Sequence, residues 1–185
     1  MLHALCLLLL SAAHADPFPL DKVPEPLKPW VQWVLDGNEE SRCPMLAGGA
    51  APGGRQRPCE WPARLELSVE DTQGRFRQDW QVYKDGWAPL PGDAKRWPLD
   101  LQVDGRPAAA VLRGSVPHVR LAAGAHTVTG EFRWDSMPEL IQVPGETGLV
   151  SLAIRGKKVP FPNRDEEGRL WLQKASGRQE GESTI

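Results

Sequence analysis

The amino-acid sequence predicts a mainly β protein: an antiparallel β-sandwich, immunoglobulin-like or jelly-roll-like, with one short N-terminal helix. About ten short segments between residues 62 and 173 alternate apolar with polar residues, and turn signals recur at intervals of roughly eight to twelve residues, as in β-sandwiches. Helical periodicity is not sustained after Leu35. The 185 residues include 18 Gly and 18 Pro, which favours many turns and few long helices. The gaps between segments are too short for the helical crossovers of a parallel sheet.

The first fifteen residues have the pattern of a secretory signal peptide. Residues 2–10 are almost wholly apolar, and Ala13-His14-Ala15 fits the small-x-small cleavage rule. The apolar run is too short to span a bilayer well, and a buried N-terminal strand or helix is the alternative. A leader of this kind predicts a periplasmic or cell-envelope protein whose mature chain begins at Asp16.

Two cysteines, Cys43 and Cys59, remain once residues 1–15 are removed. An exported protein with an even, small number of cysteines is expected to pair them. The alternative is a pair of metal ligands, but no other Cys and no His lies within four residues of either one, as a zinc site requires. We therefore predict a Cys43–Cys59 disulfide.

Residues 16–61 form a region distinct from the strands. It opens with a proline-rich lead-in, which disfavours regular structure. Leu27, Trp30, Val31 and Val34 then recur at three- and four-residue steps and predict one face of a short helix, with Gly37 as its stop and Trp33 off the stripe. A loop rich in Gly and Pro follows between residues 39 and 61, and the two cysteines bracket its centre.

Residues 62–173 are predicted to be the β-sandwich domain, and residues 174–185 a polar tail. Asp71–Gly74 predicts a hairpin loop, and Asp104-Gly105 a tight turn after alternating Leu99, Leu101 and Val103. Residues 149–154, 159–161 and 170–172 are the last three strand candidates. The apolar phase of the clearest strands predicts one shared core of Leu65, Leu67, Val69, Trp80, Val82, Val128, Phe132 and Trp134.

The chain lacks the usual signatures of catalysis and cofactor binding. It has no Walker loop, no dinucleotide-binding glycine fingerprint and no Gly-x-Ser-x-Gly elbow, so no catalytic residue, cofactor or metal is predicted. The formal net charge of −2 argues against a nucleic-acid partner. His118 and His126 are either a pair across a hairpin or two separate polar positions on a sheet. Asp165-Glu166-Glu167 with Asn163 predicts a solvated turn, with a weak calcium site as the alternative.

Eight tryptophans against one tyrosine and four phenylalanines is an unusual aromatic balance. Trp87 and Trp97 frame the polar segment that ends at Arg96, so these three residues are the candidate ligand surface. Indole rings on an exported β-sandwich favour stacking against sugars. The alternative is that these tryptophans close the open end of the sandwich.

Several phrases resemble the N-terminal region of a group of long, uncharacterised exported cell-envelope proteins of proteobacteria. The phrases that carry the resemblance are Pro29-Trp30-Val31, Val34-Leu35-Asp36-Gly37, Cys43-Pro44 with Cys59, Trp61-Pro62-Ala63-Arg64-Leu65, Leu90-Pro91-Gly92-Asp93, Trp97-Pro98, Gly124-Ala125-His126 and Phe132-Arg133-Trp134. The resemblance covers residues 26–173 and implies an envelope location and a β fold, without an activity. It also implies a chain that continues past Ile185.

Three functions are open on the sequence. The first is a non-catalytic module of the bacterial envelope, part of a larger protein or assembly, whose partner is another envelope protein or the missing C-terminal continuation. The second is a carbohydrate-binding module that uses the loop tryptophans. The third is an enzyme with a dispersed carboxylate pair. The apolar strand at Leu170–Leu172, followed by a polar tail, predicts an uncovered edge and self-association of the isolated chain.

Overall fold

The computed structural model describes residues 20–36, 43–44 and 58–173, so the predicted signal peptide and the polar tail lie outside the described residues. The helical elements are η1 (Leu20–Lys22), η2 (Glu25–Trp30) and α1 (Val31–Leu35). The strands are β1 (Glu60–Val69), β2 (Gln73–Val82), β3 (Gly86–Pro89), β4 (Leu99–Val103), β5 (Arg106–Pro107), β6 (Val111–Arg113), β7 (Val116–Leu121), β8 (Gly124–Arg133), β9 (Leu140–Gln142), β10 (Leu149–Ile154), β11 (Lys157–Val159) and β12 (Arg169–Trp171). No helix among the described residues is both long and apolar enough to cross a membrane.

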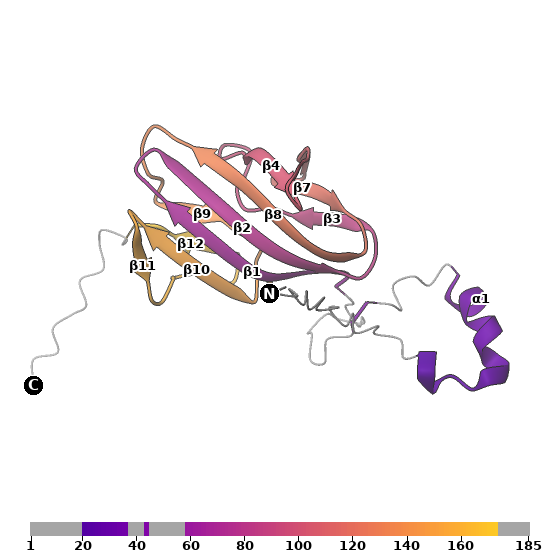
Figure 1. Ribbon diagram of the computed structural model, residues 1–185. Coiled ribbons are helices and arrows are strands. Elements are labelled where there is room, and N and C mark those ends of the chain that lie inside the picture. Colours follow the sequence, from indigo (N-terminus) through magenta and orange to yellow (C-terminus); the bar gives the residue numbers. More distant parts are fainter. Residues whose placement is uncertain (1–19, 37–42, 45–57, 174–185) are drawn as a thin grey trace, which may run out of the picture.

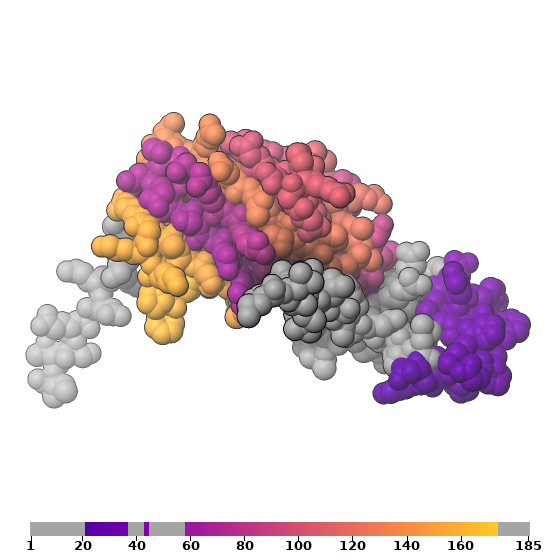
Figure 2. Space-filling view, in the orientation of Figure 1, coloured from indigo at the N-terminus to yellow at the C-terminus, as the bar shows by residue number. Residues whose placement is uncertain are grey.

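A seven-stranded sheet forms one layer of the protein, in the order β11-β10-β1-β2-β8-β4-β5. Its long central strands β1, β2 and β8 run antiparallel, and they form a continuous face in Figure 2. One pair departs from the predicted antiparallel pattern, because β10 lies parallel to β1. The chain can make this pairing since more than sixty residues separate the two strands in sequence, far beyond the dozen or so that a crossover needs.

Two smaller sheets form the other layer (Figure 1). One has the order β3-β7-β6, and the other pairs β12 with β9. A hydrogen bond from Gly92 N to Gln142 O, 2.7 Å long, connects the two. The predicted class, a mainly β sandwich with one short α-helix near the N-terminus, is confirmed.

The predicted core is confirmed. Seven of its members are at most 2% exposed, and the half-buried Trp134 packs against them with its ring 6.1 Å from that of Phe132. The buried cluster also contains Phe76, Ala88, Leu90, Leu101, Val119, Leu121, Ile141, Val143, Leu152, Leu170 and Leu172. Gln78 shares the inward face of β2 and is fully buried; its side-chain Nε2 donates to Thr147 Oγ1 at 3.3 Å, whereas its Oε1 has no hydrogen-bond partner among the described residues.

Two segments depart from the predicted pattern. Leu99 is exposed although Leu101 is buried, because a register shift follows Leu99 where β4 pairs with β8, and Asp100 adopts a left-handed φ of 49°. The prediction of an uncovered apolar edge at Leu170–Leu172 was wrong. Both leucines are buried, since β9 pairs with β12 on one side and Arg164 bridges Leu170 on the other.

The predicted N-terminal helix is present as η2 followed by α1. Its apolar residues do not enter the core: Leu27, Trp30 and Val34 are all more than half exposed, and so is Trp33. The rings of Trp30 and Trp33 contact each other edge to face, with centroids 6.2 Å apart. The sequence periodicity thus predicted the helix correctly. The apolar stripe of this helix is exposed, although such a stripe is usually buried in a globular protein.

The ring of Phe76 lies over Gly130 on the inward face of β2 and β8. Phe76 is paired with Gly130, and a Cβ placed on Gly130 would lie 2.6 Å from Cε1 of the Phe76 ring. We expect Gly130→Ala to lower the free energy of unfolding by about 1–3 kcal/mol, as overpacking does, because the buried ring has no space to move into. Urea unfolding of Gly130→Ala and of Gly145→Ala, whose added Cβ would be 3.5 Å from its nearest neighbour, tests this. Equal stability of the two variants would refute it.

Candidate functional site

A pocket of about 760 Å³ lies where the three sheets meet, and we call it the junction pocket. The large sheet contributes Glu60, Pro62 and Trp80, and the three-stranded sheet contributes Pro89 and Val116. The remaining lining comes from Pro58, from β9 with the turn that follows it, and from the turn before β12: Gln142, Val143, Pro144, Gly145, Glu146 and Glu166. Its volume lies within the range that ligand sites usually have.

The wall of the junction pocket is mainly apolar. Pro58, Pro62, Pro89 and Pro144 all line it, together with the indole of Trp80. Proline rings are rigid and offer apolar contact surface without a backbone donor. Pro62 is tolerated within β1 because the register with β2 shifts between Pro62 and Arg64.

Three carboxylates, Glu60, Glu146 and Glu166, are the charged part of this lining, and no Lys, Arg or His is among its residues. Glu146 and Glu166 lie on exposed turns, whereas Glu60 is partly buried. Desolvation by burial raises the pKa of Glu60 above its ordinary value, although its own backbone N–H and the charges of Lys84 and His118 act in the opposite direction. The lining therefore holds two exposed carboxylates, Glu146 and Glu166, and one partly buried carboxylate, Glu60, that is costly to ionise.

The predicted disulfide between Cys43 and Cys59 is present, with 4.8 Å between the two Cα atoms. Cys59 lies between Pro58 and Glu60, two residues that line the junction pocket. Tyr83 N donates to Cys59 O at 2.8 Å, which attaches the same residue to the end of β2. The rim of the pocket is thus held by a covalent link as well as by the sheet.

The turn that closes the other side of the pocket is also anchored. Thr147 is 1% exposed, and its hydroxyl donates to Pro144 O at 2.8 Å while accepting from Gln78 Nε2. Arg164 Nη1 donates to Thr147 O at 2.8 Å. These bonds fix the Pro144–Thr147 turn to the inward face of β2.

The residues of the predicted ligand surface have separate environments. Trp87 lies on the face of β3 opposite to buried Ala88, and the guanidinium groups of Arg113 and Arg120 lie 5.3 and 6.0 Å from its ring centroid. Such contacts are cation–π interactions, and they occupy ring surface that a sugar would need. Trp87 and Arg113 also line a hollow of about 510 Å³, shared with Glu60, Lys84 and His118.

Arg96 and Trp97 belong to the turn before β4. Arg96 Nη1 forms an ion pair with Asp93 Oδ2 at 2.6 Å, and the other carboxylate oxygen accepts from the backbone N–H groups of Lys95 and Arg96. Arg96 thus stabilises its own turn. Trp97 is half-buried, and no ring contact joins it to Trp87 in the described part of the chain.

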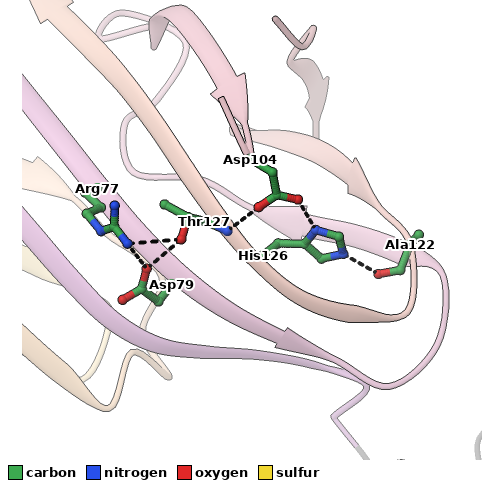
Figure 3. A network of polar contacts seen from close by, with 6 residues as sticks. All are labelled: Arg77, Asp79, Asp104, Ala122, His126 and Thr127. Atoms are coloured by element: carbon green, nitrogen blue, oxygen red, sulfur yellow. Dashed lines mark hydrogen bonds and ion pairs between the residues drawn. The ribbon is translucent and has the colours of Figure 1, made fainter. Parts of the chain in front are cut away.

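A polar network runs along β8 between Asp79 and Ala122 and involves the second of the two histidines (Figure 3). Asp104 Oδ2 lies 2.7 Å from His126 Nδ1, and His126 Nε2 lies 3.0 Å from Ala122 O. Thr127 donates from its backbone N to Asp104 and from its hydroxyl to Asp79. His118 is in β7, in another sheet, and contacts Val116 O, so the alternative of a histidine pair is wrong.

Asp104 gives this network a dependence on pH. Desolvation opposes ionisation, but hydrogen bonds from Thr127 N and His126 outweigh it and hold the pKa of Asp104 below its ordinary value. A carboxylate whose pKa is lower in the folded state stabilises the fold at pH values above its unfolded-state pKa. This stabilisation is lost as the pH falls through its folded-state pKa. We expect Asp104→Asn to cost at most about 1 kcal/mol at neutral pH, because the carboxylate is half exposed and screened by solvent.

Thermal unfolding of Asp104→Asn at a series of pH values measures this effect. The difference from the parent should shrink below about pH 3.9, the ordinary carboxyl value, and vanish once the folded-state carboxylate is protonated. Asp135→Asn, on the exposed turn after β8, is the matched control. A deficit that persists unchanged at low pH would show that Asp104 acts through packing instead.

The acidic turn predicted at Asp165–Glu167 is confirmed as a solvent-exposed turn. Asp165 Oδ2 pairs with Arg169 Nε at 2.6 Å, and Arg169 Nη2 lies 3.2 Å from Glu167 Oε2. Among the described residues, no three His, Cys, Asp or Glu side chains are grouped so that they could hold a metal ion. Glu166 belongs to the junction pocket, a site that sequence reasoning missed.

No protein-family model and no curated protein matches the chain. Among solved structures, the M1 zinc metallopeptidase from Deinococcus radiodurans is similar to part of it, with a TM-score of 0.35 and 14% identity over 64% of this chain and 27% of that one. The E323A variant of an M1 zinc metallopeptidase from the same organism is similar with a TM-score of 0.34 and 10% identity, over 53% of this chain and 32% of that one. The chain thus spans about a third or less of the length of these proteins. A likeness at this TM-score carries no argument about activity.

Proposed function

We propose that this chain is an exported, non-catalytic β-sandwich module of the bacterial cell envelope that acts by contact with another protein. The observation that carries the proposal is the Cys43–Cys59 disulfide. Structural disulfides persist in oxidising compartments such as the periplasm. The signal-like segment of residues 1–15 supports the same location.

The polar side chains best suited to acid–base chemistry support a non-catalytic role. His126 has an oxygen partner at each ring nitrogen, and Asp104 joins it to the backbone of Thr127. Asp165 accepts from both the backbone and the guanidinium of Arg169. These groups hold strands and turns in place, whereas the junction pocket offers its carboxylates and apolar walls to a partner.

Expression of the full chain in a Gram-negative host, followed by fractionation and intact-mass analysis, tests export. We expect a periplasmic product that begins at Asp16 and carries no alkylatable thiol. A variant without residues 2–15 is the control and should remain in the cytoplasm with both thiols free. Full-length protein in the cytoplasm with reduced cysteines would contradict the proposal.

The carbohydrate-binding alternative has a separate test. The guanidinium groups of Arg113 and Arg120 occupy the surface of the Trp87 ring that a sugar would stack on, so we expect no binding on a glycan array. Saccharide binding that is lost in Trp87→Ala, or in Trp97→Ala, and is kept in Trp33→Ala would establish the alternative function.

A further inference from the structure

We propose that the junction pocket binds a peptide segment of the partner protein that carries a lysine or arginine between apolar residues. This inference rests on the proposed function, because it names the chemistry of the partner. Three independent features of the pocket point to such a ligand: its charge, an unpartnered buried donor, and its rigid apolar walls.

The carboxylates of the pocket lining favour a ligand with a positive charge. Glu146 and Glu166 come from two separate turns and are exposed, and Glu60 is the first residue of β1. No basic side chain is among the lining residues, but Lys84 and His118 beside Glu60 offset its charge, so Glu146 and Glu166 are the carboxylates that a ligand cation would meet. A guanidinium or ammonium group on a long flexible stem can reach carboxylates that are spread around a rim, and its methylene groups cover apolar surface.

Trp80 adds a requirement for a hydrogen-bond acceptor. Its side chain lines the pocket and is 2% exposed, yet the indole Nε1 has no hydrogen-bond partner in the described part of the chain. A buried N–H without a partner costs free energy that a ligand acceptor can recover. Peptide carbonyl oxygens are acceptors of this kind, which favours a peptide over a simple amine.

The walls suit an extended backbone with apolar neighbours. Pro58, Pro62 and Pro89 are rigid, and the turn at Pro144 is tied through Thr147 to Gln78. At the opposite rim, Tyr83 N donates to Cys59 O and ties that residue to the end of β2. A site that is already formed before binding loses little conformational entropy when the ligand arrives.

Fluorescence polarisation with labelled synthetic peptides tests the proposal on the mature, oxidised protein. The probe is Gly-Pro-Leu-Arg-Leu-Pro-Gly, and the matched peptides have Gln or Glu in place of Arg. We expect the Arg peptide to bind at least about fivefold more tightly than the Gln peptide, with affinity falling as salt rises, as expected for partly exposed charge pairs. The Glu peptide should bind most weakly.

Charge-neutralising variants locate the site. We expect Glu146→Gln combined with Glu166→Gln to weaken binding of the Arg peptide by roughly tenfold, since each exposed pair contributes up to about fivefold. Glu139→Gln combined with Glu167→Gln removes the same charge at two exposed positions outside the pocket and should leave binding unchanged. Equal effects of the two double variants would overturn the proposal.

The indole N–H of Trp80 provides a direct readout in ¹H–¹⁵N spectra of labelled protein. We expect its signal to move downfield when the Arg peptide binds, as the N–H gains an acceptor, while the signal of Trp97 stays in place. Trp80→Phe identifies the peak; if that variant does not fold, triple-resonance assignment of the parent protein does. A Trp80 signal that does not move while the peptide is bound would overturn the proposal.

The remaining outcomes separate this inference from the proposed function. Calcium chloride that displaces the peptide and moves the Trp80 signal, where sodium chloride of equal ionic strength does not, would assign the pocket to a metal ion and overturn peptide binding. Equal affinity for the Arg, Gln and Glu peptides would also overturn it. Both results leave the export test and the module itself unaffected, whereas a reduced cytoplasmic product overturns the proposed function alone.

Discussion

Replacement of Phe132 by alanine is expected to lower the free energy of unfolding by about 3–5 kcal/mol, the usual cost of truncating a buried aromatic residue. Phe132 is fully buried, and its ring centroid lies 5.4 Å from that of Phe76 and 6.1 Å from that of Trp134. A Cβ on Gly92 would lie 3.0 Å from the same ring, so Phe132 also supports the turn before β4. Several elements therefore lose contact at once.

Urea unfolding followed by tryptophan fluorescence measures the loss. Phe161→Ala is the matched control, because the same side chain is 92% exposed there and surface truncations usually change stability by no more than about 0.5 kcal/mol. If Phe132→Ala does not fold, Phe132→Leu leaves a smaller cavity and should still cost about 1 kcal/mol. Equal midpoints for Phe132→Ala and Phe161→Ala would refute the packing argument.

The strong strands of this fold could be predicted because their burial follows the sequence period. Leu65, Leu67 and Val69 alternate with polar and charged residues, so the order of residues alone shows which face avoids water. The same alternation placed the polar Gln78 on the inward face of β2. Its partner Thr147 could not be foreseen, since the two residues are far apart in sequence and meet only through tertiary packing.

Local irregularity explains where the predictions were wrong. The shift of register after Leu99 turns that side chain outward, and the alternation of apolar and polar residues carries no sign of it. The three-residue strand β9 is too short to show a period, so the cover that it gives to Leu170 was missed. A parallel partner for β1 likewise depends on topology alone.

The candidate site could not be predicted because it also depends on the topology of the sheets. The junction pocket draws residues from Pro58 to Glu166, and they meet only because three sheets converge. Its best sequence signal is the occurrence of prolines beside strand residues, as at Pro58, Pro62 and Pro144. The two tryptophans predicted to form a ligand surface lie in different elements, Trp87 in β3 and Trp97 in the turn before β4, and Trp87 contacts two arginines.

Loss of the Cys43–Cys59 disulfide is expected to lower the free energy of unfolding by about 3 kcal/mol. The bridge closes a loop in the unfolded chain and so lowers the conformational entropy of that state. The two cysteines are 16 residues apart, and Cys43 is 2% exposed. Alanine at both positions removes the bridge without leaving a polar atom buried. Urea unfolding of this double variant and of the oxidised parent gives the difference.

A reducing agent provides the control for this last prediction. It should move the midpoint of the parent toward that of the double variant and leave the variant itself unchanged. We expect the pocket rim to survive in the folded state, because Tyr83 N still bonds to Cys59 O, or to the alanine carbonyl that replaces it, and β1 still pairs with β2. Affinity for the Arg peptide should then change far less than stability. Insensitivity of the parent midpoint to reduction would show that the bridge constrains neither the folded nor the unfolded chain.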